Sequence, residues 1–107
     1  NGNETRTYCY ISDILDALCI AAEKSYKEHF IGPLNIGSEI PIKIVDLAKK
    51  IIKVSGKDIN LQKIPSKNPK TMSQTLDCGL AKTILDGWTP LISLDTGLEK
   101  MYSQYIK

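Results

Sequence analysis

The sequence predicts an α/β chain, better described as α+β when it stands alone, with four helices and three or four short strands. Two observations predict this fold class. Apolar residues recur at helical spacing in four segments, and short runs rich in β-branched and aromatic residues lie between them. The 107 residues, of which 42% are hydrophobic and 24% charged, suffice for one domain with a modest core.

The first predicted strand and the first predicted helix follow directly on one another. Residues 5–11, Thr-Arg-Thr-Tyr-Cys-Tyr-Ile, are rich in side chains that favour a strand. Ser12 or Asp13 then offers an acceptor for the free amides of a helix that we expect to end near Tyr26. The apolar residues at helical spacing in this helix are Ile11, Ile14, Leu15, Leu18, Cys19 and Ala22.

Glycine and proline separate the next elements. Gly32 and Pro33 break the chain, and residues 34–37 predict a short buried strand that enters a turn. A brief extended piece at residues 40–42 leads into a second helix, for which Gly56 is the expected left-handed stop. The apolar face of this helix comprises Ile44, Leu47, Ala48, Ile51 and Ile52.

The second half of the chain predicts a strand, a loop and two helices. Residues 58–64 alternate in a way consistent with a half-exposed strand, and residues 65–73 shift to the composition of a basic loop. Asp77 can cap a short third helix that Gly87 ends, and Ser93 can cap the last helix. The apolar positions of the two helices are Leu80, Ala81, Ile84 and Leu85, then Leu94, Leu98, Met101, Tyr102 and Tyr105.

Charge and cysteine usage exclude several classes of protein. Because 14 Lys and Arg oppose 12 Asp and Glu, the formal charge is only +2, and we expect neither a nucleic acid nor a membrane as partner. No apolar run approaches the roughly 20 residues of a membrane span. Cys9, Cys19 and Cys78 are odd in number and form no Cys-x-x-Cys, which predicts reduced, mostly buried thiols in a cytoplasmic protein.

The sequence offers no catalytic residue and no metal site. His29 is the only histidine, and its place after Lys27 and Glu28 favours a solvated helix end. No glycine-rich phosphate loop is present, and no tyrosine has a lysine four residues later. Asn35 is more naturally a turn residue than a substrate contact, and Trp88 is more naturally a core residue than a base-stacking one. We therefore expect this chain to bind no cofactor by itself.

Two local features could bind an anion. Arg6 stands in an otherwise apolar strand, where a guanidinium must find a carboxylate, a phosphate or water. Lys63, Lys67 and Lys70 concentrate positive charge in the predicted loop. Each feature also has an ordinary structural explanation, because strand arginines pair with carboxylates and lysine-rich loops are commonly solvated. Both interpretations stay open on residue chemistry alone.

Five segments, taken in order, resemble extended short-chain dehydrogenase/reductase enzymes that act on nucleotide sugars. Residues 5–13 resemble the Thr-Arg-Asp-Phe-Ile-Tyr-Val-x-Asp segment of that family, and residues 34–38, Leu-Asn-Ile-Gly-Ser, resemble its Tyr-Asn-Ile-Gly-Ser turn. Residues 42–52 are similar to the family's Ile-Ser-Ile-x-Glu-Leu-Ala helix. Residues 77–90 resemble its Asp-x-Ser-Lys-Ala-Lys-x-x-Leu-Gly-Trp-x-Pro signature, and residues 93–98 the start of its terminal helix. Decarboxylase-like and epimerase-like members are the most similar.

The resemblance implies that residues 1–107 form the carboxy-terminal nucleotide-sugar-binding domain of an NAD(P)-dependent epimerase, dehydratase or decarboxylase. In that family a preceding Rossmann domain, absent from this chain, holds NAD or NADP and carries the catalytic tyrosine and lysine. The chain would then be the small domain that normally packs on a Rossmann domain. Because it begins at Asn1 without an initiator methionine, we expect the chain to be an excerpt from a longer protein. Because the catalytic residues of the family lie in the Rossmann domain, we expect the excerpt to have no turnover of its own. A nucleoside diphosphate sugar is the implied partner, and the parent enzyme is expected to be a homodimer.

The resemblance also implies two substrate-binding residues. Arg6 matches by position the family arginine that reaches the nucleotide diphosphate, and Lys67 falls close to a second arginine in an Arg-Pro-Gly-Asp loop. The chain departs from the family in this loop, which is Ser-Lys-Asn-Pro-Lys over residues 66–70, and at Thr7, where the family usually has Asp. Two other functions stay open, namely a freestanding binding or interaction module and nucleic-acid binding through the lysine loop.

Overall fold

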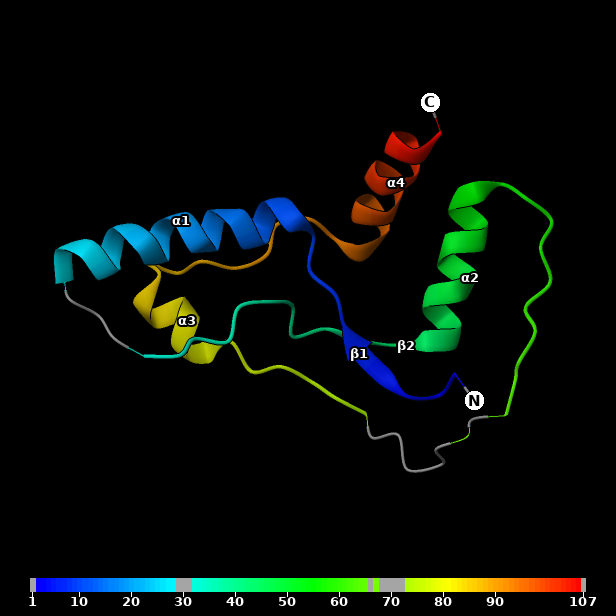
Figure 1. Cartoon of the computed structure of the whole chain (residues 1–107), viewed down its shortest axis with the longest axis horizontal. Helices are drawn as coiled ribbons and strands as arrows, with labels where there is room; N and C mark the ends of the chain where they lie inside the picture. Colours follow the sequence, from blue (N-terminus) through cyan, green and yellow to red (C-terminus); the bar gives the residue numbers. More distant parts are fainter. Residues whose placement is uncertain (1, 29–31, 66, 68–72, 107) are drawn as a thin grey trace.

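The computed structural model describes residues 2–28, 32–65, 67 and 73–106. Its elements are β1 (Thr5–Thr7), α1 (Ile11–Glu28), β2 (Pro41–Lys43), α2 (Ile44–Ser55), α3 (Gly79–Ile84) and α4 (Leu94–Tyr105). They form a flat, elongated molecule of 52 × 39 × 18 Å. Figure 1 shows α1 and α3 at one end, α2 and α4 at the other, and the short β1–β2 sheet between them. Four helices with a small sheet confirm the predicted α+β class.

The sheet is a two-stranded antiparallel ribbon in which Arg6 pairs with Ile42. The predicted first strand is shorter than expected, since β1 ends at Thr7 instead of residue 11. The last pair of the ladder joins Thr7 to Pro41, and a proline has no backbone N–H with which to extend it.

Two other strands that the sequence predicts do not form among the described residues. Residues 34–37 alternate between half-buried Leu34, exposed Asn35 and half-buried Ile36, but no described strand lies beside them to complete a ladder. Residues 58–64 are exposed throughout and likewise join no strand. The predicted short buried strand at residues 34–37 is thus only partly buried, and the backbone pairing that defines a strand is missing among the described residues.

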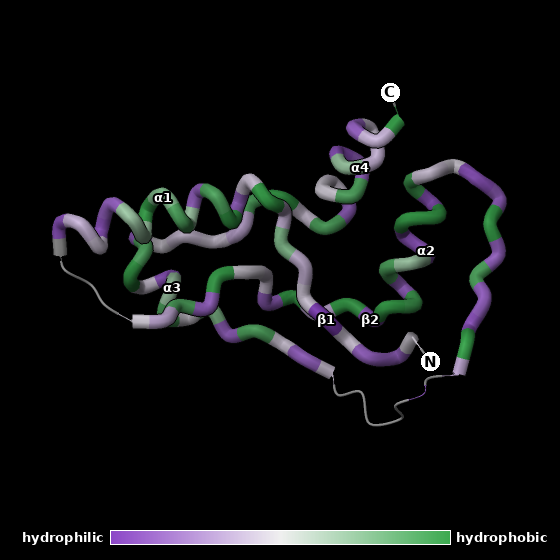
Figure 2. Tube along the Cα trace, viewed as in Figure 1, coloured by the Kyte–Doolittle hydropathy of each residue, from purple (hydrophilic) through white to green (hydrophobic). Residues whose placement is uncertain are grey.

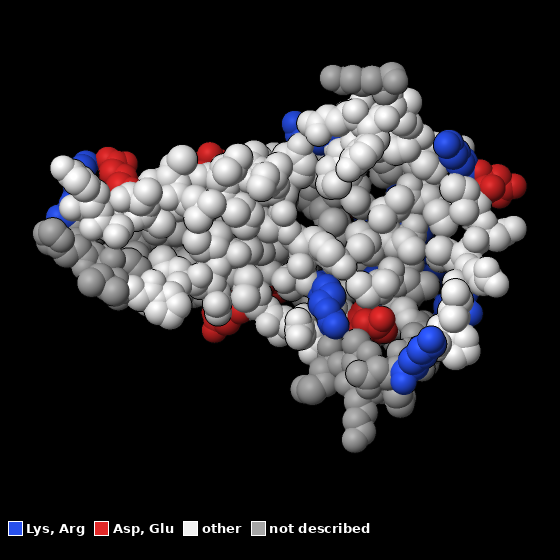
Figure 3. Space-filling model, in the orientation of Figure 1, with Lys and Arg blue, Asp and Glu red and all other residues white. Residues whose placement is uncertain are grey.

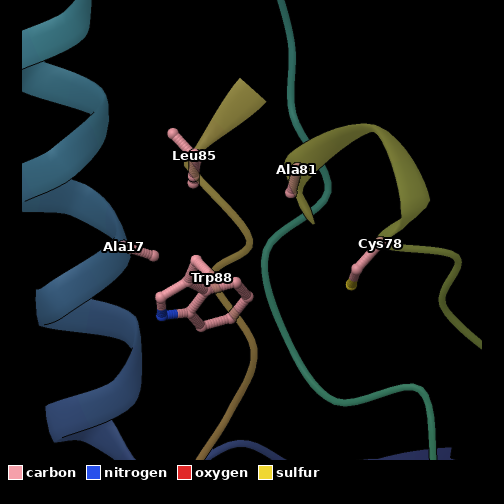
Figure 4. Packing of buried hydrophobic residues seen from close by; sticks show 5 residues of the cluster. All are labelled: Ala17, Cys78, Ala81, Leu85 and Trp88. Carbon is pink, nitrogen blue, oxygen red and sulfur yellow. The ribbon is translucent and has the colours of Figure 1, made fainter. Parts of the chain in front are cut away.

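The buried core lies between α1 and the segment that contains α3. In Figure 4, Ala17 points from α1 towards the ring of Trp88, with Leu85 and Ala81 on the side of α3. The indole Nε1 of Trp88 donates a hydrogen bond to the Asp13 carbonyl oxygen at 3.1 Å, so the buried ring has a polar partner. The predicted core position of Trp88 is confirmed.

The helix ends partly follow the predicted capping residues. Ser93 caps α4, because its Oγ accepts from the Thr96 amide at 3.2 Å, and Gly56 ends α2 with φ 64° and ψ 11°. Asp77 acts one residue earlier than a cap, since its Oδ1 accepts from the Gly79 amide at 2.8 Å while Cys78 occupies the cap position.

The predicted cap of α1 by Ser12 or Asp13 is wrong. The helix already begins at Ile11, and the amides of Asp13 and Ile14 both donate to the Tyr10 carbonyl oxygen. The Asp13 carboxylate is buried and turned towards another segment, where its Oδ2 accepts from the Ile92 amide at 2.9 Å. Asp13 therefore fastens α1 to the segment that leads into α4.

The cysteines are free, as predicted, but they are not mostly buried. Cys78 is buried, Cys9 is half-buried and Cys19 is exposed on α1. Burial raises the pKa of the Cys9 and Cys78 thiols above the ordinary value. Cys19 lies on the side of α1 that faces away from the core, which explains the departure from the prediction.

Candidate functional site

Arg6 occupies the centre of β1, one of the two strands of the sheet. Its strand pairs on one edge with β2, and on the other edge the Gln74 amide donates to the Thr5 carbonyl oxygen at 3.0 Å. The Thr5 amide in turn donates to Ser73 Oγ at 3.1 Å. Both edges of β1 are thus engaged, so the backbone that carries Arg6 is held firmly.

The Arg6 side chain is half-buried and folds back along its own strand. Its Nη1 donates to the Thr5 carbonyl oxygen at 2.7 Å. The neighbouring carboxylate of Glu4 has a pKa below its ordinary value, mainly because of a hydrogen bond to a backbone amide and, to a lesser degree, because of the Arg6 charge. The planar guanidinium is therefore partly oriented by local contacts.

Among the described residues of the basic loop, Ser73 contacts β1, and so does Gln74, which directly follows the loop. Lys63 and Lys67 are exposed, and Lys67 stands between segments, residues 66 and 68–72, that lie outside the described residues. Lys70 and His29 also lie outside the described residues. The structure accordingly places Arg6 in detail and shows for Lys67 only that it is solvent-facing.

The two cavities recorded for the described residues both lie beside Tyr8, two residues after Arg6. The larger cavity, of about 700 Å³, opens between residues 38–42, the segment 89–95, Lys50 and Lys82. The smaller, of about 270 Å³, lies between α2, α4 and residues 8–10. Arg6 and Lys67 do not line either of them. Tyr8 was not singled out from the sequence, although its position two residues after Arg6, a candidate anion-binding residue, was a usable signal.

Two ion pairs line the larger cavity. Lys82 Nζ lies 2.6 Å from Glu39 Oε1, and Lys50 Nζ lies 2.6 Å from Asp95 Oδ1. The hydrogen bond that Lys82 donates to the Glu39 carboxylate raises the pKa of Lys82. Because each of these lysines already has a carboxylate partner, the cavity wall carries little net charge for an incoming phosphate.

Asn35 is a structural residue, as predicted. Its Nδ2 donates to the Asp77 carbonyl oxygen at 3.2 Å, across 42 positions of the chain. Nearby, Gly37 allows a close approach, because a Cβ at this position would lie 2.6 Å from Leu76 Cδ2. The Asn-Ile-Gly segment therefore serves to hold the start of α3 against the chain that precedes β2.

The residues of this chain do not fit a dinucleotide. The sequence has no glycine-rich phosphate loop, and the described strands form an antiparallel pair without the parallel β-α-β unit on which such loops depend.

Among the described residues no group of three or more His, Cys, Asp or Glu side chains could hold a metal ion. None of the helices described is long and apolar enough to cross a membrane. Figure 3 shows Lys and Arg interspersed with Asp and Glu on the visible face.

Comparisons with known proteins extend over nearly the whole chain. UDP-glucuronic acid decarboxylase 3 from Arabidopsis thaliana is 29% identical over 104 residues, which are 97% of this chain and 29% of the relative. Putative GDP-L-fucose synthase 2 from the same organism is 29% identical over 109 residues. The chain thus spans less than a third of the length of these curated relatives. No family model matches it.

Solved structures give the same result in three dimensions. UDP-glucuronic acid 4-epimerase from Bacillus cereus, in complex with a fluorinated UDP-glucuronic acid and NAD, matches with a TM-score of 0.80 and 31% identity, over 96% of this chain and 32% of the epimerase. UDP-glucose 4-epimerase from Thermotoga maritima, with UDP-glucose, matches with a TM-score of 0.81 and 26% identity, over 100% of this chain and 34% of the epimerase. In both sequence and fold, the chain is thus similar to about one third of these nucleotide-sugar decarboxylases and epimerases, in agreement with the resemblance to the carboxy-terminal part of extended short-chain dehydrogenase/reductase enzymes.

Proposed function

We propose that the chain is the substrate-binding part of an NAD(P)-dependent nucleotide-sugar epimerase, dehydratase or decarboxylase. The observation that carries this proposal is the match of 96–100% of the chain to epimerases whose structures contain a UDP-sugar. The nucleoside diphosphate sugar is the substrate, and Arg6 is the residue that holds its diphosphate. Lys67 adds a solvent-exposed positive charge without the bidentate hydrogen bonding of an arginine.

The contribution of this chain is binding and orientation. NAD(P), held by a Rossmann domain elsewhere in the polypeptide, supplies transient oxidation at the sugar ring. Arg6 is suited to the diphosphate because a guanidinium presents parallel N–H donors to phosphate oxygens, and because β1 is fixed on both edges. Anchoring the diphosphate at one end places the sugar at a set distance from the groups that react.

The chain's own residues supply no step in bond chemistry. Burial raises the pKa of the Cys9 and Cys78 thiols, so these groups are poor nucleophiles near neutral pH.

The parent enzyme is proposed to be a cytoplasmic homodimer. Free cysteines, including exposed Cys19, support the reducing compartment.

Turnover of UDP-glucuronic acid and UDP-glucose tests the proposal. The full-length protein, incubated with NAD, is expected to convert at least one of them, whereas the 107-residue chain with the same additions is expected to convert neither. Conversion by the chain alone would contradict the division of labour. If the full-length protein binds no nucleotide sugar, the chain is a binding or interaction module of another kind.

A further inference from the structure

The positive charge of this chain is concentrated in one stretch of the sequence. Residues 43–73, which we call the lysine-rich segment, contain eight lysines and two acidic residues, so their net charge is +6. The other residues contain six basic and ten acidic side chains, and their net charge is −4. The overall charge of +2 therefore averages over a strong asymmetry along the chain.

Both ends of the lysine-rich segment meet β1 at Thr5, the residue directly before Arg6. Lys43 is the register partner of Thr5 in the sheet. At the other end, Ser73 Oγ accepts from the Thr5 amide at 3.1 Å, and the amide of Gln74, the next residue, donates to the Thr5 carbonyl oxygen at 3.0 Å. The segment thus leaves the sheet and returns to it at the same residue of β1, so its charge surrounds the strand that carries Arg6.

Most of the segment's lysines whose placement is described face solvent and keep their full charge. Lys50 is half-buried, and its Nζ lies 2.6 Å from Asp95 Oδ1. The others are exposed, and no ion pair is recorded for them with any part of the chain that the structure describes. These exposed lysines are Lys43, Lys49, Lys53, Lys57, Lys63 and Lys67. Figure 2 shows hydrophilic residues recurring along α2 and the chain that follows it. Together these ammonium groups produce a positive potential around β1.

Helix α2 carries part of this charge away from the sheet, as Figure 1 shows. Lys49 and Lys53 follow Ile44, the first residue of α2, by five and nine positions. At 1.5 Å per residue they lie about 8 and 14 Å along the helix axis. The Debye length is about 30 Å at 0.01 M salt and about 3 Å at 1 M. The two charges should therefore act on a ligand near β1 at low salt, and salt should abolish their effect.

We infer that the lysine-rich segment guides the nucleotide sugar to Arg6 by electrostatic attraction and thereby raises its rate of association. The inference rests on the proposed function, in which Arg6 holds the diphosphate. A nucleotide sugar is an anion, and a surface potential of opposite sign raises association rates by about 10- to 1,000-fold. A nucleic acid is the less favoured anion, because residues 43–73 contain no arginine to read bases and no aromatic side chain on which bases could stack.

Removal of charge from α2 in the full-length protein tests the inference. The variant Lys49→Gln/Lys53→Gln loses two of the six net positive charges of the segment. The control Lys27→Glu changes the net charge of the protein by the same amount at an exposed position of α1, at the opposite end of the molecule from α2 (Figure 1). Stopped-flow fluorescence measures the association rate constant kon and the dissociation rate constant koff for UDP-glucuronic acid and UDP-glucose, at about 0.01 M and about 1 M salt.

The α2 variant should associate more slowly with the nucleotide sugar at low salt. Because the logarithm of the enhancement scales with the charge, losing a third of it should lower kon by about 2- to 10-fold. The value of koff should stay nearly unchanged, since Lys49 and Lys53 act at a distance from the bound ligand. Lys27→Glu should lower kon less. At about 1 M salt the kon values of all three proteins should agree, which also checks that the variants are folded.

The outcomes separate electrostatic guidance from the proposed function. Equal kon values for the α2 variant and the unmodified protein at low salt would overturn the guidance and leave the function standing. An equal fall in Lys27→Glu would assign the effect to overall charge, and a change confined to koff would assign it to direct contact; either result would also overturn the guidance. Failure of the unmodified full-length protein to bind either nucleotide sugar would contradict the proposed function instead.

Discussion

The two ends of the molecule are packed differently. The end built from α1 and α3 holds the buried residues Ala17, Cys78, Ala81, Leu85 and Trp88. At the other end, α2 has no buried residue, and the only buried residue of α4 is Gly97. A Cβ at Gly97 would lie 3.1 Å from Cδ2 of the Tyr10 ring. Both recorded cavities reach α4 or the residues just before it. The chain therefore combines one packed end with one loosely packed end, which both cavities reach.

This contrast follows from the side chains that each end can bring together. Trp88 and Leu85 fill the space beneath α1, whereas α2 and α4 meet through half-buried aliphatic residues and a few polar contacts. One of these contacts is the hydrogen bond from the Tyr102 hydroxyl to the Ser55 carbonyl oxygen at 3.0 Å. Loosely packed regions open at lower free energy, and binding sites are commonly drawn from them.

The largest expected effect comes from leucine truncation at the packed end. Leu85→Ala should lower the free energy of unfolding by about 2–5 kcal/mol, because it leaves a cavity beside Trp88. The matched change Leu47→Ala, at a half-buried position of α2, should cost about 1 kcal/mol. Urea unfolding of the full-length variants, followed by circular dichroism, measures both. Equal losses would show that the two ends do not differ in packing.

A smaller effect is expected from the residue that connects the two ends. Asp13→Ala removes the acceptor of the Ile92 amide and should cost about 1–3 kcal/mol. Asp13→Asn retains a carbonyl acceptor and should restore much of that loss. Hydrogen exchange at the Ile92 amide provides the local readout, and unchanged protection in the alanine variant would remove Asp13 from this role.

The smallest effect is expected at the start of α4. Ser93→Ala removes the cap that accepts from the Thr96 amide, and should lower the free energy of unfolding by about 1 kcal/mol. The control Ser103→Ala removes a hydroxyl that donates to the Lys100 carbonyl oxygen of its own helix. This change should alter the free energy of unfolding by only about a few tenths of a kcal/mol. Thermal unfolding of both variants makes the comparison, and a larger loss at Ser103 would contradict the assigned cap.

Local chemistry in the sequence predicted much of this fold. The four helices, the stop at Gly56 and the Ser93 cap follow from side-chain spacing and short-range hydrogen bonds, which the sequence contains directly. The errors at residues 34–37 and at Asp13 concern long-range pairing. Whether residues 34–37 form a strand depends on a neighbouring strand, and the buried carboxylate of Asp13 depends on a partner at Ile92.

For the candidate site, too, individual residues could be predicted from the sequence, whereas the arrangement that depends on folding could not. The resemblance singled out Arg6, and the structure shows how β1 holds it. Tyr8 was missed because only folding brings it to both cavities, where residues from segments far apart in the sequence meet. Exposed Cys19 was misjudged because helical spacing shows which residues share a face, and does not show that a helix with two apolar faces has one of them uncovered.

The proposed role of Arg6 in holding the diphosphate is tested most directly by measuring how the full-length Arg6→Ala variant binds a nucleoside diphosphate sugar. Loss of a charged hydrogen bond of about 1.5–3 kcal/mol should raise the Kd for the nucleotide sugar about 10- to 150-fold in calorimetry, while the Kd for NAD stays nearly unchanged. Arg6→Lys should recover part of the affinity, since it keeps the charge and loses the planar fork. An unchanged Kd for the nucleotide sugar in the alanine variant would assign Arg6 to structure and contradict the account.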